Sequence, residues 1–241
     1  MNNNIVLTSN VRMARGALTR LLSRDSGREE GMALLYGRPG EGKTTAVGYL
    51  MNQYDAVFLR ANIAWTTSIT AMLQALMREL EHEPLAYRAP MLEVAIEVLA
   101  RTGRPLFVDE ADYCLRNMDL LDALRDIYDS ARAPVVLITM ETAPRIIRSS
   151  ARLARFRRRI TEWIEFQGLS LEDARQVAAE LVDVRIEEDL LDRLHRETDG
   201  NIGLMVPALG RVEQAARASG LEAISLETFG ARGLLPGGLV A

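Results

Sequence analysis

Short apolar runs alternate with longer stretches of helical spacing through the first two thirds of the chain. The runs predict strands at 32–36, 56–59, 106–108, 135–139 and 163–166. Between the third and fourth runs, apolar side chains recur at helical spacing from Leu115 to Tyr128, which is typical of an amphipathic helix. Because strands and helices alternate, we predict an α/β fold in which helices cover both faces of a parallel sheet.

Helix-start signals lie before the first run and after the last. The segment Thr8–Asn10 offers three N-cap candidates and predicts an opening helix at about 11–23. The segment Ser170–Asp173 is typical of a capping box, and the apolar residues after it keep helical spacing with no strand between them. We therefore predict an α/β domain at 1–167, a small helical domain at 168–229 and a loosely ordered Gly- and Pro-containing tail at 230–241.

Composition favours a folded protein with a sizeable core. The 241 residues are 48% hydrophobic and 26% charged, which excludes a disordered chain. No apolar run approaches the roughly 18 residues that a membrane helix needs, and the first residues lack the pattern of a secretion signal. We expect a cytoplasmic protein that does not act at a membrane. A single cysteine, Cys114, excludes an internal disulfide and a dedicated zinc site.

The first predicted strand leads directly into a phosphate-binding loop. Residues 37–45, Gly-Arg-Pro-Gly-Glu-Gly-Lys-Thr-Thr, match G-x-x-x-x-G-K-[ST] between a strand and a helix, and that context disfavours a chance match. The backbone N–H groups can wrap a polyphosphate, Lys43 can reach the β- and γ-phosphates of ATP, and the Thr44 hydroxyl can coordinate Mg²⁺. The loop residues expected to bind nucleotide are Gly37, Pro39, Gly40, Glu41, Gly42, Lys43, Thr44 and Thr45.

The chain uses arginine far more than lysine: 28 of its 29 lysine and arginine residues are arginine, and the one lysine is Lys43. A planar guanidinium cannot replace the compact ammonium at the phosphate position, so the distribution is consistent with a functional constraint at Lys43. Arginine-rich usage also has a simpler explanation, since GC-rich coding DNA favours arginine over lysine.

Two carboxylates end the third predicted strand. Asp109 is placed to support the Mg²⁺ of a nucleotide at the neighbouring loop, and Glu110 is placed to polarise a water molecule for attack on the γ-phosphate. Together with the loop, this pair favours ATP hydrolysis. A P-loop phosphotransferase acting as a monomer is an alternative, although no second substrate pocket is evident.

Three features carry a family resemblance: the phosphate loop, the segment Asp109–Asp112, and the spacing from that segment to residues 124–129 and 133–138. By these features the chain resembles the AAA+ ATPases over about residues 5–220. Within them it resembles the DNA-transposition helper ATPases of the phage Mu B type. The resemblance implies a five-stranded sheet in the order 5-1-4-3-2, a helical lid, ATP hydrolysis and a homo-oligomeric ring or helical filament with ATP at subunit interfaces.

The resemblance also implies further catalytic roles. Thr139 matches the polar sensor at the end of the fourth strand. The segment 157–159 lies where the family keeps its arginine finger; Arg159 is the favoured residue, then Arg158, and three consecutive arginines, including Arg157, leave the register open. Gly203 stands where many members place the second-sensor arginine. Its loss implies turnover that is slow or depends on DNA or a partner.

Arginines gather ahead of the fifth predicted strand. Between residues 145 and 159 there are seven arginines and no acid, and five of them recur at spacings of 3, 4, 3 and 4, which predicts one face of a helix. In a chain of net charge −4 this face suits the phosphates of DNA or an acidic partner, and equally a solvated face paired with acids. The turns after the second and third strands could also meet phosphates, although Trp65 there is a core or interface candidate. The candidate DNA contacts are Arg60, Asn62, Thr66, Arg116, Arg145, Arg148 and Arg152.

The sequence thus predicts an ATP-dependent, largely sequence-independent duplex-DNA-binding ATPase that assembles on DNA and recruits or activates a transposase. The alternative from another class is a nucleotide-switched, initiator-like or signalling module that acts through protein partners without DNA.

Overall fold

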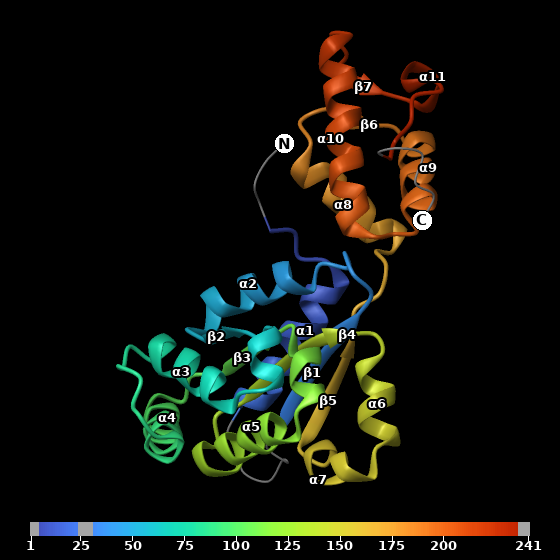
Figure 1. Cartoon of the computed structure of the whole chain (residues 1–241). Helices are drawn as coiled ribbons and strands as arrows, with labels where there is room; N and C mark the ends of the chain where they lie inside the picture. The colour runs from blue at the N-terminus through green and yellow to red at the C-terminus, as the bar shows by residue number, and fades with distance from the viewer. Residues whose placement is uncertain (1–4, 24–30, 236–241) are drawn as a thin grey trace. The chain divides into compact units, whose positions relative to one another are not determined.

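A five-stranded parallel sheet organises residues 13–37 and 43–165, one of the two units of the chain, which we call the sheet unit. The other unit, which we call the helical unit, comprises residues 1–12, 38–42 and 166–241. The computed structural model describes residues 5–23 and 31–235 (Figure 1).

The strand order confirms the predicted sheet. The strands pair in the order β2-β3-β4-β1-β5, which is the predicted order seen from the other edge, and all the pairs are parallel. The strands are β1 (Met32–Gly37), β2 (Val57–Arg60), β3 (Leu106–Asp109), β4 (Val135–Met140) and β5 (Ile160–Glu165). The last strand starts earlier than predicted because β5 is an edge strand, where polar Thr161 and Glu162 are tolerated.

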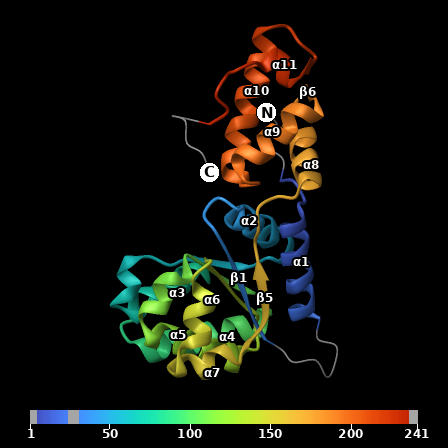
Figure 2. The same ribbon diagram turned by 90° about the vertical axis from the view of Figure 1, so that its right-hand side faces the viewer.

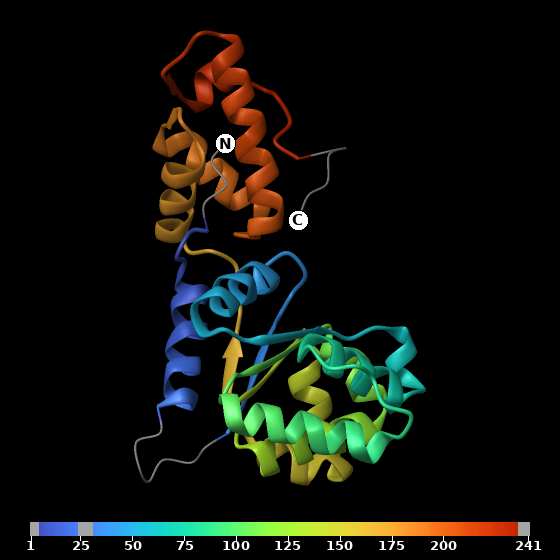
Figure 3. The same cartoon turned by 90° about the vertical axis from the view of Figure 1, so that its left-hand side faces the viewer.

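Helices cover both faces of this sheet. Figures 2 and 3 show α1 and α2 on one face and α3, α4 and α5 on the other. This division follows from right-handed crossovers, because the chain moves one way along the sheet through α2 and the opposite way through the later helices. The helices are α1 (Ser9–Leu22), α2 (Lys43–Tyr54), α3 (Ile69–Glu79), α4 (Arg88–Thr102), α5 (Met118–Ala131), α6 (Ala143–Ser149) and α7 (Ala154–Arg157), with 3-10 turns η1 (Ile63–Thr66), η2 (Ala111–Arg116) and η3 (Ala151–Leu153).

Strand residues on both faces are buried, which explains why the central strands read as continuous apolar runs. Every residue of β3 is buried, and alternate positions such as Leu106 and Val108 join the core under α3, α4 and α5. Phe107, between them, is also fully buried. The polar residues at the carboxyl ends of the strands therefore lie at one edge of an otherwise apolar sheet.

The predicted arginine-lined helix over 145–159 is wrong. Helix α6 ends at Ser149, Ser150 is extended with φ −85° and ψ 117°, and the chain continues as η3 and α7. This break lets Leu153 and Phe156 bury their side chains at 2% and 3% exposure. Packing of these apolar residues overrides the periodicity of the arginines, which consequently do not share one helix face.

The helical unit holds α8 (Leu171–Leu181), α9 (Glu188–Thr198), α10 (Ile202–Ala218) and α11 (Leu226–Phe229). As predicted, the Ser170 side chain caps α8 by accepting from the Asp173 backbone. The expectation of no strand is wrong, because β6 (Arg185–Ile186) pairs with β7 (Ala223–Ile224). A strand of two residues is too short to show an alternating pattern in the sequence. Leu234 and Leu235 are buried in the core of this unit, and residues 236–241 lie outside the described part.

No helix within 5–23 and 31–235 is both long enough and apolar enough to cross a membrane.

Candidate active site

The carboxyl edge of the sheet brings together the predicted Mg²⁺ residues. Thr44 lies in the first turn of α2, and Asp109 is the last residue of β3. The Thr44 hydroxyl donates to Asp109 Oδ2 at 3.4 Å, and the backbone N–H of Glu110 donates to Asp109 Oδ1 at 2.9 Å. Asp109 is only 4% exposed. Thr44 and Asp109 are 65 positions apart in sequence. Their side chains meet because the parallel strands β1, which precedes Thr44, and β3, which contains Asp109, end at the same edge of the sheet.

Burial raises the pKa of the Asp109 carboxyl above its ordinary value. The desolvation of this carboxylate outweighs the hydrogen bonds from Glu110 and Thr44, so its charge lacks full compensation. A carboxylate and a hydroxyl are the oxygen ligands that Mg²⁺ prefers. Within the described residues no cluster of three or more His, Cys, Asp or Glu could hold a metal by itself. The donor set therefore fits an ion whose remaining ligands come from nucleotide phosphates and water.

Glu110 has a left-handed backbone, with φ 55° and ψ 33°. Among the residues that the structure describes, the other non-glycine residues with positive φ are Asp55, Glu81, Arg132 and Asp199. These four all follow helix ends, whereas Glu110 follows a strand. A non-glycine residue in this region costs about 1 kcal/mol or more, and such strain concentrates at functional sites. The Glu110 side chain is 43% exposed and accepts from Arg60 at 3.5 Å.

Lys43 and Thr139 lie on neighbouring elements of the same edge. Lys43 donates to the Gly37 carbonyl at the end of β1. Thr139 is 2% exposed on β4, paired in register with Tyr36 of β1, and its hydroxyl donates to the Leu35 carbonyl at 3.5 Å.

Asp112 is a site residue to which the sequence assigns no role. Its Oδ2 accepts from the Met140 N–H at 3.0 Å, which ties η2 to the end of β4 that carries Thr139. Its place three residues after Asp109 is the signal that could have drawn attention to it.

Residues 38–42 of the phosphate loop are held by the segment that begins α10. Gly40 and Gly42 adopt φ +81° and +83°, a region that favours glycine. Asn201 Nδ2 donates to the Pro39 carbonyl at 2.8 Å, and the Gly203 N–H donates to the Gly40 carbonyl at 2.8 Å. These contacts turn two loop carbonyls toward residues 201–203.

The Glu41 side chain closes the loop on itself. It is 4% exposed and accepts from the Arg38 N–H at 2.7 Å and from Arg38 Nε at 3.0 Å. Arg38 also pairs with Asp199 at 3.0 Å. The carboxylate of Glu41 thus stabilises the loop backbone, whereas Thr45 is exposed on α2.

Local packing explains why residue 203 is glycine. A Cβ there would lie 3.0 Å from Gly40 Cα and 3.2 Å from the Gly40 carbonyl oxygen, so a side chain would displace the loop. The position that the resemblance matches to the second-sensor arginine is therefore a close approach of two backbones.

The three arginines before β5 have different surroundings. Arg159 makes a bidentate pair with Asp129 of α5, at 3.0 and 2.8 Å. Arg157 donates to the Arg148 carbonyl at 2.6 Å. Arg158 is exposed, and no partner for it occurs among the described residues. Of the three, Arg158 is the guanidinium available to a second molecule.

The DNA candidates on the turns after β2 and β3 lie side by side. Asn117 Nδ2 donates to the Thr66 carbonyl at 3.2 Å, which joins η1 to the start of α5. Asn62 caps η1, and Arg116 stacks 5.7 Å from the centre of the Tyr113 ring. Trp65 is 2% exposed and belongs to the core.

The candidates before β5 do not gather in one place. Arg145 and Arg148 lie on α6, and the Arg148 guanidinium sits 4.6 Å from the ring centre of Trp163. Arg152 lies beyond the break, in η3.

A model of the AAA domain matches residues 25–147. The fold is similar to that of the Aeropyrum pernix ORC2 protein in its ADPNP–ADP complexes, with TM-score 0.64 and 19% identity over 95% of this chain and 68% of that one. No curated protein matches the sequence.

Two further solved structures share the fold. The Thermotoga maritima RuvB Holliday junction branch migration motor has TM-score 0.60 and 20% identity over 92% of this chain and 67% of that one. The Aeropyrum pernix ORC1 protein, solved in complex with DNA, has TM-score 0.57 and 16% identity over 94% of this chain and 64% of that one.

The buried charge of Asp109 leads to a prediction about stability. Because the pKa is raised on folding, the folded state binds more protons, and stability falls as pH rises from the ordinary aspartate pKa through the folded one. In EDTA at pH 7, Asp109→Asn should therefore be more stable than wild type by about 1 kcal/mol. The difference should vanish below about pH 4. Urea unfolding across pH measures it, with exposed Asp192→Asn as control; a destabilised Asp109→Asn at pH 7 would contradict it.

The contact at Gly203 leads to a second prediction. Gly203→Ala should lower the free energy of unfolding by about 1–3 kcal/mol, because its Cβ forces Gly40 to move. Gly16→Ala in α1 is the matched control, since its Cβ meets only the Arg20 guanidinium at 3.5 Å and should leave stability unchanged or raised. Equal urea midpoints for Gly203→Ala and wild type would show that the two backbones separate without cost.

Proposed function

Because the chain belongs to the AAA domain family, we propose that it is an ATPase that binds duplex DNA in its ATP state, assembles there with further copies, and recruits or activates a transposase. The observation that carries the ATPase part is the meeting of the Thr44 hydroxyl with the buried Asp109 carboxylate beside Glu110.

In this proposal each site residue has one task. Lys43 binds the β- and γ-phosphates, and Thr44 and Asp109 hold Mg²⁺, which when bound neutralises phosphate charge. Glu110 accepts a proton from the attacking water, and Thr139 orients that water. Asp112 positions the end of β4 through its hydrogen bond to the Met140 N–H.

The pairing of Arg60 with Glu110 supports coupling between DNA and hydrolysis. Arg60 is a DNA candidate, yet its guanidinium meets the catalytic carboxylate at 3.5 Å. The side chains are 68% and 43% exposed, so the pair contributes at most about 1 kcal/mol. A DNA phosphate can therefore displace Glu110 from Arg60 at little cost. Basal hydrolysis is then slow because Glu110 is engaged, and DNA speeds it by releasing the carboxylate.

Support for DNA as the partner comes from the joined turns and from related folds. Arg60 is the last residue of β2 and pairs in register with Asp109, and Arg116 ends η2, next to Asn117, which is hydrogen-bonded to η1. ORC1 was solved in complex with DNA, and RuvB is a branch migration motor. None of these groups forms a base-reading set, so we propose sequence-independent, salt-sensitive binding. The transposase part rests on the resemblance to the Mu B type.

A hydrolysis and DNA-binding experiment tests the proposal. Wild type should bind a duplex more tightly with a non-hydrolysable ATP analogue than with ADP, and duplex DNA should raise ATP turnover. Lys43→Ala should lose both effects. Arg60→Ala should raise basal turnover several-fold and remove most of the stimulation by DNA, because Glu110 is already free.

Phosphate release and fluorescence anisotropy at two salt concentrations give the readouts. ATP-dependent assembly that ignores DNA at low salt would instead support the nucleotide-switched module that acts through protein partners.

The surroundings of the three arginines give a separate prediction about the finger. Arg158→Ala should lower DNA-stimulated turnover by about 10³-fold while leaving nucleotide affinity and thermal stability unchanged. Arg159→Ala should lower stability by up to about 1 kcal/mol, because it breaks the half-buried pair with Asp129.

A mixture of subunits provides the control. The Lys43→Ala variant still has Arg158, and the Arg158→Ala variant still has an intact phosphate loop. In a mixture, Arg158 of the first variant can act at the nucleotide site of the second, so part of the lost turnover should return. Normal turnover in Arg158→Ala with loss in Arg159→Ala would assign the finger to Arg159 instead.

A further inference from the structure

The segment that begins α10 controls the direction of two peptide groups in the phosphate loop. Within the helical unit, Asn201 Nδ2 donates to the Pro39 carbonyl at 2.8 Å, and the Gly203 N–H donates to the Gly40 carbonyl at 2.8 Å. In a planar trans peptide, the carbonyl and the N–H of the next residue point in opposite directions. Holding these two carbonyls therefore aims the N–H groups of Gly40 and Glu41 away from α10.

The loop glycines pack closely against the same segment. Gly40 and Gly42 have φ +81° and +83°. A Cβ on Gly40 would lie 2.5 Å from Asn201 Oδ1, and a Cβ on Gly42 would lie 3.2 Å from Ile202 Cγ2. The side chains of two consecutive residues thus fit against the two glycines, so the contact constrains the shape of the loop as well as its hydrogen bonding.

The segment around Asn201 is itself fixed by hydrogen bonds. The Asn201 N–H donates to the Thr198 carbonyl at 2.8 Å, and the Leu169 N–H donates to the Gly200 carbonyl at 2.7 Å. Asn201 Oδ1 caps α10 by accepting from the Leu204 N–H at 3.2 Å. Because these bonds hold Asn201 independently of the loop, its side chain is a fixed support on which the loop is ordered.

This support offers the nucleotide no positive charge. No lysine, arginine or histidine occurs from residue 197 to residue 210, so the start of α10 acts on the loop through its carbonyls. The N–H groups of such a loop cradle the α- and β-phosphates, which ADP and ATP share. A change at Asn201 should therefore alter the binding of both nucleotides by the same factor.

We propose that Asn201 is a positioning residue for nucleotide binding, which holds the phosphate loop in its phosphate-binding conformation for ADP and ATP alike. It acts through the Pro39 carbonyl and touches no phosphate itself. Because the loop is ordered before the nucleotide arrives, less conformational entropy is lost on binding. The proposal rests on the nucleotide binding included in the proposed function and adds a residue 162 positions from Pro39 in sequence.

Two substitutions separate the contact with the loop from the capping of α10. Asn201→Ser keeps a capping oxygen for Leu204 but is too short to reach Pro39, whereas Asn201→Ala loses both interactions. Asn201→Ser should weaken binding of ADP and of a non-hydrolysable ATP analogue by the same factor, about 3- to 10-fold, as expected for one lost hydrogen bond. Asn201→Ala should weaken both at least as much and should also unfold at a lower urea concentration.

Fluorescent ADP and a fluorescent non-hydrolysable ATP analogue, each titrated with Mg²⁺ present, measure the two affinities. Urea unfolding in EDTA without nucleotide measures stability. In steady-state ATP hydrolysis, Asn201→Ser should raise KM by the same factor as the dissociation constants and leave kcat within about twofold, because Asp109 and Glu110 are unchanged.

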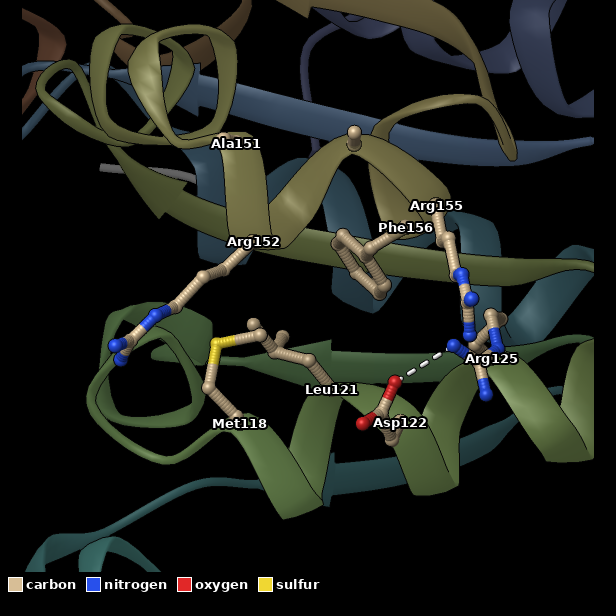
Figure 4. A pocket seen from close by; sticks show the side chains of 9 residues that line it. Met118, Leu121, Asp122, Arg125, Ala151, Arg152, Arg155 and Phe156 are labelled. Atoms are coloured by element: carbon tan, nitrogen blue, oxygen red, sulfur yellow. Dashed lines mark hydrogen bonds and ion pairs between the residues drawn. The ribbon is translucent and has the colours of Figure 1, made fainter.

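The pocket between α5 and the segment formed by η3 and α7 supplies the matched control (Figure 4). There Asp122 accepts a hydrogen bond from Arg125 at 2.7 Å, and its side chain is 53% exposed. Asp122→Ser also removes a surface hydrogen bond, but in a pocket that contains no residue of the phosphate loop. It should bind both nucleotides as wild type does.

The outcomes separate the two proposals. Wild type that binds neither nucleotide overturns the proposed function and this role together. Wild type that binds both, while Asn201→Ser binds them equally tightly, overturns the role of Asn201 alone and leaves it as a helix cap. A loss confined to the ATP analogue also overturns it, because it would assign the contact to the γ-phosphate.

Discussion

The buried carboxylate of Asp109 is the constraint on which the candidate site depends. It lies at the end of β3, a central strand whose residues are all buried, and water reaches only 4% of its surface. Its neighbours on either side, β2 and β4, end in Arg60 and beside Thr139, so the strand order determines which groups can act together. A carboxylate held at this cost of desolvation is poised for a cation, and bound Mg²⁺ with nucleotide would return stability that the empty site lacks.

A second constraint is the close approach of backbones around residues 38–42. The Pro39 and Gly40 carbonyls accept hydrogen bonds from Asn201 and Gly203, and the Arg38 N–H donates to Glu41, so the donors for an anion are the loop N–H groups after Arg38. Such an approach favours glycine at 203, because a Cβ there would lie only 3.0 Å from Gly40 Cα. At the position that the resemblance matches to the second-sensor arginine, the loop and the start of α10 are thus joined through the backbone.

Sequence patterns predicted the strands of a parallel sheet because apolar runs and a phosphate loop are local signals, and the strand order came from the resemblance. They failed where packing between distant residues decides. The arginine spacing suggested one helix, yet burial of Leu153 and Phe156 breaks it at Ser150. The contact of Arg60 with Glu110 was equally out of reach, because it depends on two strand ends that only the folded sheet brings together.

The distribution of charge in the sheet unit bears on how copies could recognise one another. Net charge is only −4, but arginines surround α6 and α7 while acids occupy the loop after α3. An exposed ion pair contributes at most about 1 kcal/mol, so these charges select which surfaces meet without supplying much affinity.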